Sequence, residues 1–413
     1  MKTMTSERGA ILLHVAMGIM VLIGVTTFVV DYGVMWVGRR QAQNAADAGA
    51  LAGAVAMAFD ANGWTNRTVT GPARTAARQM AVSNVVWGQA ANVNITTDVV
   101  FTDQPADRCA PDPAGNTPCI RVDVYRNQAR GNALPAIFGL AVGLTQQGVR
   151  ATATARVAVA NASDCMKPWA IPDKWLDQYD VTAPTLPPNT WTLDDEFETK
   201  KKQGNTWIPL VPPDVYTPPS AYDPGTGFTV QVNRGLQLTL KQGSPQTAIA
   251  PGVFYPVRIP RYDGISTGGN DYRENIASCN GVPIEIGDTI QTENGNMIGP
   301  TKQGVQDLIA LDPNADWDSS TQSVVGSCAQ SASPCAANSP RIVAIPLFDT
   351  AQYYAGKLNG LTTLTVVNIV GFFIDRMQGN NVVGYFTQAP GLSTGNSSIA
   401  PEASFLTQIQ LVR

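Results

Sequence analysis

The strongest hydrophobic pattern in the sequence is an uninterrupted apolar run near the N-terminus. From Gly9 to Val30 the chain has no formally charged side chain when His14 is neutral. A helix of this length rises about 33 Å, which is enough to cross a hydrocarbon core of about 30 Å. Soluble helices are seldom apolar on every face, and the apolar part of a signal peptide usually spans only about 7–15 residues. The run therefore predicts an uncleaved transmembrane helix.

The pattern then changes to small residues between Asp31 and Phe59, a segment without proline. The small residues recur at spacings of three and four, at Ala42, Ala45, Ala46, Gly49, Ala52, Gly53 and Ala56. Such a stripe predicts a continuation of the helix with one face that another helix can approach closely. Two interpretations stay open: the stripe packs on membrane partners, or it packs on the chain's own domain. Tyr32 and Trp36 lie where interfacial aromatic residues are expected.

Alternating patterns follow in residues 61–164 and predict a small α+β unit. The apolar stretch 132–144, with Pro135 early in it, reads as a short helix. It is too short to cross a bilayer, so we expect it in the core. The other predicted elements are a helix over 71–86 and strands over 92–101, 119–127 and 149–160.

Residues 165–413 have a different composition. Lys and Glu are absent between residues 41 and 166 and return soon afterwards, and more than half of the 29 prolines lie between Lys167 and Pro260. This composition predicts a loop- and Pro-rich, mostly β domain. Its predicted elements are a helix over 297–311 and strands over 227–232, 236–240, 341–348, 361–374, 381–387 and 405–412.

The fold class is therefore α+β, in three segments. Residues 1–60 are the transmembrane anchor and Ala-rich helix, residues 61–164 are a small, pilin-like α+β unit, and residues 165–413 are the mainly β domain. The apolar stretch 361–374 is short and rich in Thr and Val, which favours a buried central strand over a second membrane span.

Charge and histidine content exclude several functions. The net charge of −4, with 15% charged residues, gives no basic face for nucleic acid. The single histidine, His14, lies inside the apolar run. The remainder of the chain cannot build a Ser-His or Cys-His pair or a zinc site that contains histidine. Carboxylate chemistry and calcium sites remain possible.

The six cysteines lack metal-type spacing, and their even number suits disulfides in an oxidising compartment. Cys109 with Cys119 and Cys328 with Cys335 would each close a short loop, which leaves Cys165 with Cys279 by elimination. Six cysteines permit 15 connectivities, and six separate thiols are the alternative. Positive charges on the two sides of the helix nearly balance, so the cysteines, which all follow the helix, place the bulk of the chain on the oxidising side.

The N-terminal segment resembles the TadE/TadG-like proteins of Flp (Tad) pilus assembly. The resemblance covers about the first 60 residues, in the order ERG, an apolar run, VVDYG and RRQAQNAADAGALAGA. The residues that match the family pattern are Asp31, Gly33, Arg39, Gln43, Asn44, Ala45, Ala46, Asp47, Ala48 and Ala50. The resemblance implies an inner-membrane protein that faces the periplasm and works with a secretion-type ATPase and pilins.

Two features depart from relatives of this family. The run after Gly9 has no Glu, which argues against processing by a prepilin peptidase. No D-x-S-x-S motif is present in the sequence, so the metal-dependent adhesion of larger relatives is not transferred to this chain.

Three further patterns have both a chemical and a structural interpretation. Asp312, Asn314, Asp316 and Asp318 alternate as calcium ligands do, but Trp317 and Ser323 stand where a calcium loop has Gly and Glu, which favours a solvated turn. Asp194, Asp195, Glu196 and Glu198 offer a glycosidase carboxylate without a marked partner acid, so a charged surface loop is favoured. The aromatic residues between Trp169 and Tyr222 suit a glycan surface or, more simply, a loop-rich core.

The leading hypothesis is a non-enzymatic, single-pass inner-membrane component of Tad/Flp pilus assembly, without cofactor, whose partners are the membrane, other assembly proteins and pilins. The alternative is a membrane-tethered periplasmic binding module for glycan or calcium. A carboxylate-based hydrolase is a third and weaker hypothesis.

Overall fold

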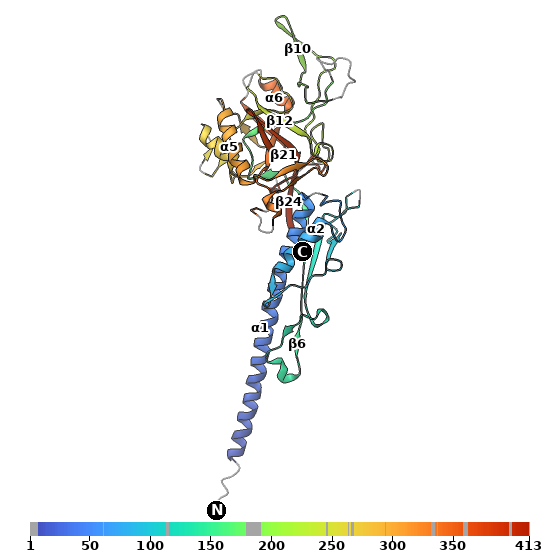
Figure 1. Ribbon diagram of the computed structural model, residues 1–413, viewed down its shortest axis with the longest axis vertical. Coiled ribbons are helices and arrows are strands. Elements are labelled where there is room, and N and C mark those ends of the chain that lie inside the picture. Colours follow the sequence, from blue (N-terminus) through green and yellow to red (C-terminus); the bar gives the residue numbers. More distant parts are fainter. Residues whose placement is uncertain are drawn as a thin grey trace, which may run out of the picture. The chain divides into compact units, whose positions relative to one another are not determined.

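The computed structural model divides the chain into two compact units (Figure 1). It describes residues 7–60, 62–112, 115–178, 191–244, 247–262, 264–265, 268–293, 295–331, 335–336, 338–357, 362–395 and 399–412. Unit 1 comprises Met1–Met57, Asn62–Val157 and Ile409–Arg413, and unit 2 comprises Ala58–Ala61 and Ala158–Gln408. Where we expected a separate anchor segment, the N-terminal helix groups with the small α+β segment, and the last residues of the chain join them.

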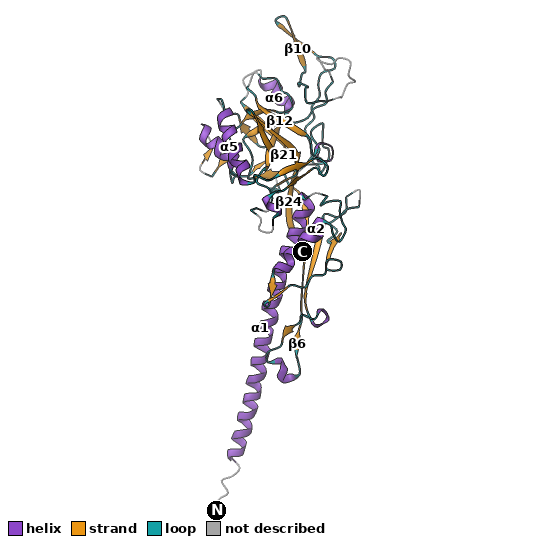
Figure 2. Cartoon of the chain, viewed as in Figure 1, coloured by secondary structure: helices purple, strands orange, loops and turns teal. Residues whose placement is uncertain are grey.

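Unit 1 is built on one long helix and a small antiparallel sheet (Figure 2). Its helices are α1 (Glu7–Phe59) and α2 (Pro72–Ser83), with short 3-10 turns at Gln128–Arg130 and Gly139–Val142. Its strands are β1 (Val85–Val86), β2 (Gln89–Ala90), β3 (Val99–Thr102), β4 (Cys119–Arg126), β5 (Leu134–Pro135), β6 (Gln146–Gln147), β7 (Val149–Val159) and the last residues of β24 (Leu406–Val412). The main sheet has the order β24-β7-β4-β3.

The two halves of α1 have opposite surroundings. Every described side chain from Ile11 to Thr26 is exposed, on all faces of the helix. This part is long and apolar enough to cross a membrane. Further along, Ala42, Ala46 and Ala50 are fully buried in a cluster that includes α2 and the inner faces of β4 and β7. One continuous helix therefore combines a lipid-compatible half with a half that forms the core of unit 1.

The small residues of α1 allow α2 to pack closely against it. A Cβ atom on Gly49 would lie 2.8 Å from the Cβ of Ala81 and 2.9 Å from the carbonyl oxygen of Ala77. A Cβ atom on Gly53 would lie 2.8 Å from the Cβ of Ala77 and 2.9 Å from Cδ1 of Ile120. Of the two interpretations of the alanine stripe, the structure supports packing on the chain's own domain. The expectation that the stripe packs on membrane partners is wrong, because its face is already covered.

Unit 2 is centred on six strands that pair in a closed ring. The ring runs β21 (Thr363–Gln378), β20 (Ile342–Phe348), β9 (Trp169–Pro172), β13 (Val253–Pro256), β12 (Gln237–Gln242) and β22 (Asn381–Thr387), and β22 pairs again with β21. The β20–β9 and β12–β13 pairs are parallel, and the other pairs are antiparallel. Closure removes the free strand edges at which other chains could pair.

All six strands contribute side chains to one buried cluster. Its largest members include Trp169, Phe254, Phe372 and Phe386. Gly384 makes room for one of them, because a Cβ at this position would lie 2.5 Å from the ring of Phe372.

The helices of unit 2 are α3 (Val230–Asn233), α4 (Gly268–Ala277), α5 (Ile298–Leu311), α6 (Thr350–Lys357) and a 3-10 turn at Cys328–Gln330.

The remaining strands of unit 2 are short. They are β8 (Ala162–Ser163), β10 (Lys200–Gln203), β11 (Thr206–Pro209), β14 (Pro260–Arg261), β15 (Gly264–Ile265), β16 (Ile284–Glu285), β17 (Thr289–Gln291), β18 (Asp316–Asp318), β19 (Ser323–Val325) and β23 (Ala389–Pro390). Among them, β17 extends the ring by pairing with β21. The fold class is thus α+β with a β-rich C-terminal region, as the sequence predicts.

Three predicted elements are wrong in whole or in part. The strand predicted over 92–101 begins only at Val99, and residues 95–98 form a turn. Residues 230–233 form the short helix α3 where the pattern at 227–232 predicted a strand. The stretch 132–144 is not a core helix: it forms part of a hairpin with a 3-10 turn, and Ile137, Phe138, Leu140 and Leu144 are exposed. Gly143 ends that turn with φ +82°, a left-handed conformation that would interrupt a helix.

Three disulfides join the predicted pairs, Cys109–Cys119, Cys165–Cys279 and Cys328–Cys335. Beside the second bond, the fully buried Lys167 donates from Nζ to the carbonyl oxygens of Asn275 (3.2 Å) and Ser278 (2.7 Å), at the end of α4. Burial lowers the pKa of Lys167 to about 7. The disulfide and the lysine together fix the end of α4 to the strand segment that leads into β9.

The packing of α1 on α2 can be tested with one substitution at two glycines. Gly49→Ala is expected to lower the free energy of unfolding of unit 1 by about 1–3 kcal/mol, because backbone and Ala81 must shift to admit the methyl group. Gly33→Ala in the same helix meets no atom within 4 Å and is expected to be neutral or stabilising by up to about 1 kcal/mol. Thermal unfolding of the detergent-purified chain measures both, and a Gly49→Ala variant as stable as Gly33→Ala would contradict the packing.

The disulfides differ in the length of chain that they close. Cys165–Cys279 joins residues 114 apart and Cys328–Cys335 joins residues 7 apart. Loop-closure entropy then predicts that alanine at both positions costs about 5 kcal/mol for the long loop and about 2.5 kcal/mol for the short one. Urea unfolding of the two double variants measures the losses, with mass spectrometry to check the remaining bonds. Equal losses, or a larger loss for the short loop, would refute this ranking.

Candidate functional site

The residues of the family pattern lie on α1, and Asp31 makes the most specific contacts among them. Its side chain is buried although it directly follows the apolar run. Oδ1 accepts hydrogen bonds from the backbone N–H groups of Ile137 (2.8 Å) and Phe138 (3.2 Å), and Oδ2 accepts one from Gly139 (2.5 Å). Gly139 permits this approach, since a Cβ there would lie 2.9 Å from Oδ2. One carboxylate thus holds three consecutive amides from a distant part of the chain.

These hydrogen bonds determine the charge of Asp31. Burial raises the pKa of the carboxyl group, but the three backbone hydrogen bonds outweigh burial and bring the pKa below its ordinary value. The group is therefore a carboxylate at neutral pH. Its charge is balanced by oriented amides and not by a cationic side chain, which is the arrangement that also caps helix N-termini.

The amides belong to a hairpin, Leu134–Gln147, which we call the apolar loop. β5 and β6 pair at its base, and the 3-10 turn Gly139–Val142 forms its tip. The base is also fixed by Leu134, which packs directly over Gly38 of α1. The apolar loop therefore runs along α1 from Gly38 toward Asp31, and β6 lies beside α1 in Figure 1.

A groove lies between α1 and β7, within unit 1. It has a volume of about 720 Å³ and is lined by Tyr32, Met35, Trp36, Arg39 and Gln43 of α1 and by Gly148–Thr152. Gln43 spans the groove, because its Nε2 donates to the carbonyl oxygen of Thr152 (3.1 Å) and to Oδ1 of Asp47 (2.8 Å). A second hollow of about 320 Å³ shares Gln43 and Thr152 and extends to Leu411 and Val412.

The remaining residues of the family pattern divide between core and surface. Ala45, Ala46 and Ala50 are fully buried in the α1–α2 contact. Asn44 is exposed, and Asp47 and Ala48 are half-buried. Gly33 has open space around its Cα. The guanidinium group of the neighbouring Arg40 lies over the ring of Trp36, 4.8 Å from its centre. The pattern thus encodes a carboxylate clamp, a groove wall and a helix-packing face.

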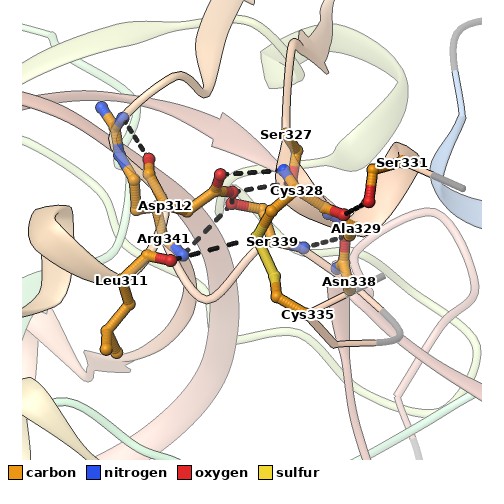
Figure 3. Close-up of a disulfide and its surroundings, with 10 residues drawn as sticks. All are labelled: Leu311, Asp312, Ser327, Cys328, Ala329, Ser331, Cys335, Asn338, Ser339 and Arg341. Atoms are coloured by element: carbon orange, nitrogen blue, oxygen red, sulfur yellow. Dashed lines mark hydrogen bonds between the residues drawn. A yellow bond between two sulfur atoms is a disulfide. The ribbon is translucent and has the colours of Figure 1, made fainter. Parts of the chain in front are cut away.

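The calcium-like sequence DPNADWD does not form a single ligand set, and Figure 3 shows the surroundings of its first residue, Asp312. Asp312 is buried and accepts hydrogen bonds from Oγ of Ser327 and of Ser339, both at 2.6 Å, and from the N–H of Cys328 (2.9 Å). Asp318 instead accepts from Ser320 and Thr321 in a turn after β18. In the part of the chain that the structure describes, no three His, Cys, Asp or Glu side chains are placed to hold a metal ion.

Asp312 has a structural role that the sequence did not suggest. Burial raises its pKa, but the hydrogen bonds from Ser327, Ser339 and Cys328 outweigh burial and lower the pKa below its ordinary value. Arg341 donates from Nη1 to the carbonyl oxygens of Asp312 (3.0 Å) and Ala315 (2.7 Å). This network fixes the end of α5 beside the disulfide Cys328–Cys335.

The other patterns with a chemical interpretation are also integrated into the fold. Asp195 accepts hydrogen bonds from the N–H and Oγ1 of Thr192, within one loop. Trp175 is buried and packs edge to face on Trp191 and Phe197. Such contacts describe a loop-rich aromatic core, the simpler of the two interpretations given for these aromatic residues.

A buried carboxylate in unit 2, Asp173, has no counterpart in the sequence analysis. It accepts hydrogen bonds from the N–H of Phe228 (2.9 Å) and from Oη of Tyr216 (3.1 Å). Burial raises its pKa to about 6 against the effect of these bonds. Both partners lie in the segment between β11 and α3, so the evident role of Asp173 is to join this segment to the end of β9.

Comparison with known proteins gives a family match within α1. Residues 9–56 match the model of the Tad family, described as "Putative Flp pilus-assembly TadE/G-like". No curated protein and no solved structure gives a significant match to the chain. The N-terminal segment is thus similar to TadE/G-like proteins over these residues, which confirms the resemblance seen in the residue pattern. The matched residues are those that form the exposed apolar half of α1, the Asp31 clamp, the groove wall and the packing face.

The Asp31 clamp can be tested by amide hydrogen exchange. In Asp31→Asn the amides of Ile137, Phe138 and Gly139 are expected to exchange faster, because a neutral amide oxygen replaces the charged acceptor. Asp47→Asn, whose side chain bonds to Gln43 on the same helix, serves as the control and should leave these three amides unchanged.

The same clamp has a defined pH dependence. Because the pKa of Asp31 is lowered on folding, its contribution is complete above the ordinary value of 3.8 and is lost as the pH falls through the folded value. Exchange of the three amides, corrected for intrinsic pH effects, should therefore accelerate only in acid and approach that of Asp31→Asn. Protection that persists in the asparagine variant would show that the carboxylate does not hold the loop.

Proposed function

We propose that this chain is a non-enzymatic, single-pass component of the Tad/Flp pilus-assembly machinery in the bacterial inner membrane. The observation that supports it is that the family match and the helix α1 cover nearly the same residues. The Tad-family match covers residues 9–56, and the same residues form one helix with an apolar exposed half and a packed half. A family segment that is both anchor and domain core suits a protein that holds a rigid body at the membrane surface.

The three disulfides support a periplasmic position for both units. Two of them lie in unit 2 and one in unit 1, and all follow the exposed apolar half of α1. Disulfides persist in the bacterial periplasm and are rare in the cytosol. Arg39 and Arg40 then lie just outside the membrane, where they can contact anionic lipid headgroups.

We assign the groove between α1 and β7 to contacts with other assembly proteins or pilins. It combines the aromatic residues Tyr32 and Trp36 with the cationic Arg39, and residues of this kind are enriched at protein interfaces. The groove contains two residues of the family pattern, Arg39 and Gln43, whose exposed or half-buried side chains are not needed for the α1–α2 contact. For the glycan- or calcium-binding alternative, no observation in the described residues adds support.

Deletion of the gene is expected to abolish surface pili, and expression of the full chain should restore them. In this background Trp36→Ala with Arg39→Ala is expected to reduce the number of pili, because both changes alter the groove wall. Val37→Ala is the matched control, since Val37 is a partly exposed neighbour outside the groove. Electron microscopy counts the pili, and immunoblotting confirms equal amounts of each variant.

Normal pili in the deletion strain would overturn the proposed function. Normal pili in the groove variant would overturn only the assignment of the groove. The compartment is checked independently with an impermeant thiol reagent after reduction of intact spheroplasts, since periplasmic cysteines react there and cytosolic cysteines do not.

A further inference from the structure

The apolar loop exposes an unusually hydrophobic surface on unit 1. Ile137, Phe138, Leu140 and Leu144 are exposed by 46%, 39%, 59% and 60%. The sequence has no charged residue from Gly131 to Gly148, whereas Arg130 and Arg150 stand just outside these limits. A contiguous apolar patch on a protein surface marks a site of interaction with a protein or a membrane.

The position of the loop along α1 identifies its surroundings. Phe138 lines a hollow of about 190 Å³ together with Ile19, Leu22, Ile23 and Thr26 of α1. These helix residues precede Asp31 by 5 to 12 positions, which corresponds to roughly 8–18 Å along the helix axis. They belong to the apolar run that spans the membrane in the proposed function. The side chain of Phe138 therefore lies beside the part of α1 that faces lipid.

Five backbone N–H groups of the loop have hydrogen-bond partners within the chain, which favours its immersion in lipid. Unpaired amides are costly in a hydrocarbon environment. Here Asp31 accepts from Ile137, Phe138 and Gly139, while the N–H groups of Gly143 and Leu144 donate to the carbonyl oxygens of Leu140 and Gly139. Pro135 has no N–H group, and β5 pairs with β6 at the base. The same carboxylate thus positions the loop and pairs the amides at its tip.

We propose that the tip of the apolar loop inserts into the outer leaflet of the inner membrane, beside the chain's own transmembrane helix. The ligand of this surface is the acyl region of the bilayer, and Asp31 is the residue that positions the loop for insertion. The proposal rests on the membrane anchoring in the proposed function. It gives unit 1 a second attachment to the membrane, next to the helix that anchors it.

The test uses the full chain in nanodiscs of phosphatidylethanolamine and phosphatidylglycerol that contain doxyl-labelled phosphatidylcholine, a fluorescence quencher located in lipid. Single cysteines that carry a bimane fluorophore are introduced by Leu140→Cys at the tip, Leu13→Cys in the anchor and Val69→Cys on the surface of unit 1. These three positions are all exposed in the protein itself. Labels at Leu140 and Leu13 should lose most of their fluorescence to doxyl lipid, while the label at Val69 should keep its own.

The comparison separates failure of the loop from failure of the anchor. Quenching at Leu13 without quenching at Leu140 would overturn the insertion of the loop and would leave its apolar surface for a protein partner. Absence of quenching at both positions would overturn the anchoring as well. Asp31→Ala is then added to each labelled chain. It should reduce quenching of the label at Leu140→Cys, and it should leave quenching of the label at Leu13→Cys unchanged. Undiminished quenching at Leu140 would show that Asp31 does not position the loop.

Discussion

The close approach of α1 and α2 is the contact on which the rest of unit 1 depends. At Gly49 and Gly53 the two helices leave no room for a single additional carbon atom. Because the buried alanines of the same face also contact β4 and β7, this packing fixes the sheet to the helix. The helix α1 therefore positions the groove wall, the apolar loop and the Asp31 carboxylate. Because α1 is continuous from its exposed apolar half to its packed half, the orientation of one half determines the orientation of the other.

The carboxylate at the end of the apolar run is stabilised by backbone hydrogen bonds. Asp31 carries its charge at the end of an apolar run, where a lone carboxylate would be strongly disfavoured. Three backbone N–H groups stabilise this charge, and the carboxylate in turn accepts the hydrogen bonds of these three N–H groups. In unit 2 the buried Asp173 and Asp312 act in the same way, as acceptors that join loops. These carboxylates stabilise local structure by joining segments that are distant in the sequence.

Local patterns predicted much of this structure, and failures arose where distant contacts decide. The helix through Phe59, the strands β4, β7 and β20 to β22, and the three cysteine pairs follow from periodicity, spacing and elimination. The apolar residues of the stretch 132–144 by themselves predict a core helix. The hydrogen bonds that hold this stretch in a hairpin come from Asp31, which lies more than 100 positions away in the sequence. The sequence likewise does not predict the closure of the six-stranded ring, since short strands such as β9 and β13 lack a distinctive pattern of apolar and polar residues. Two features of the sequence could have predicted the contact between Asp31 and the stretch 132–144. One is the aspartate directly after the apolar run, and the other is the long uncharged stretch from Gly131 to Gly148.

The division of unit 1 into separate stretches of chain has a consequence for biogenesis. Its last strand segment, Ile409–Arg413, follows the whole of unit 2 in the sequence. During synthesis α1, β3, β4 and β7 are made early, yet the edge of the sheet beside β7 stays open until the end of β24 has been made. Unit 2 is therefore free to close its ring and form its disulfides before unit 1 is complete. A chain truncated within unit 2 would leave the sheet of unit 1 without β24, so the smaller unit depends for its completion on residues that follow the larger one.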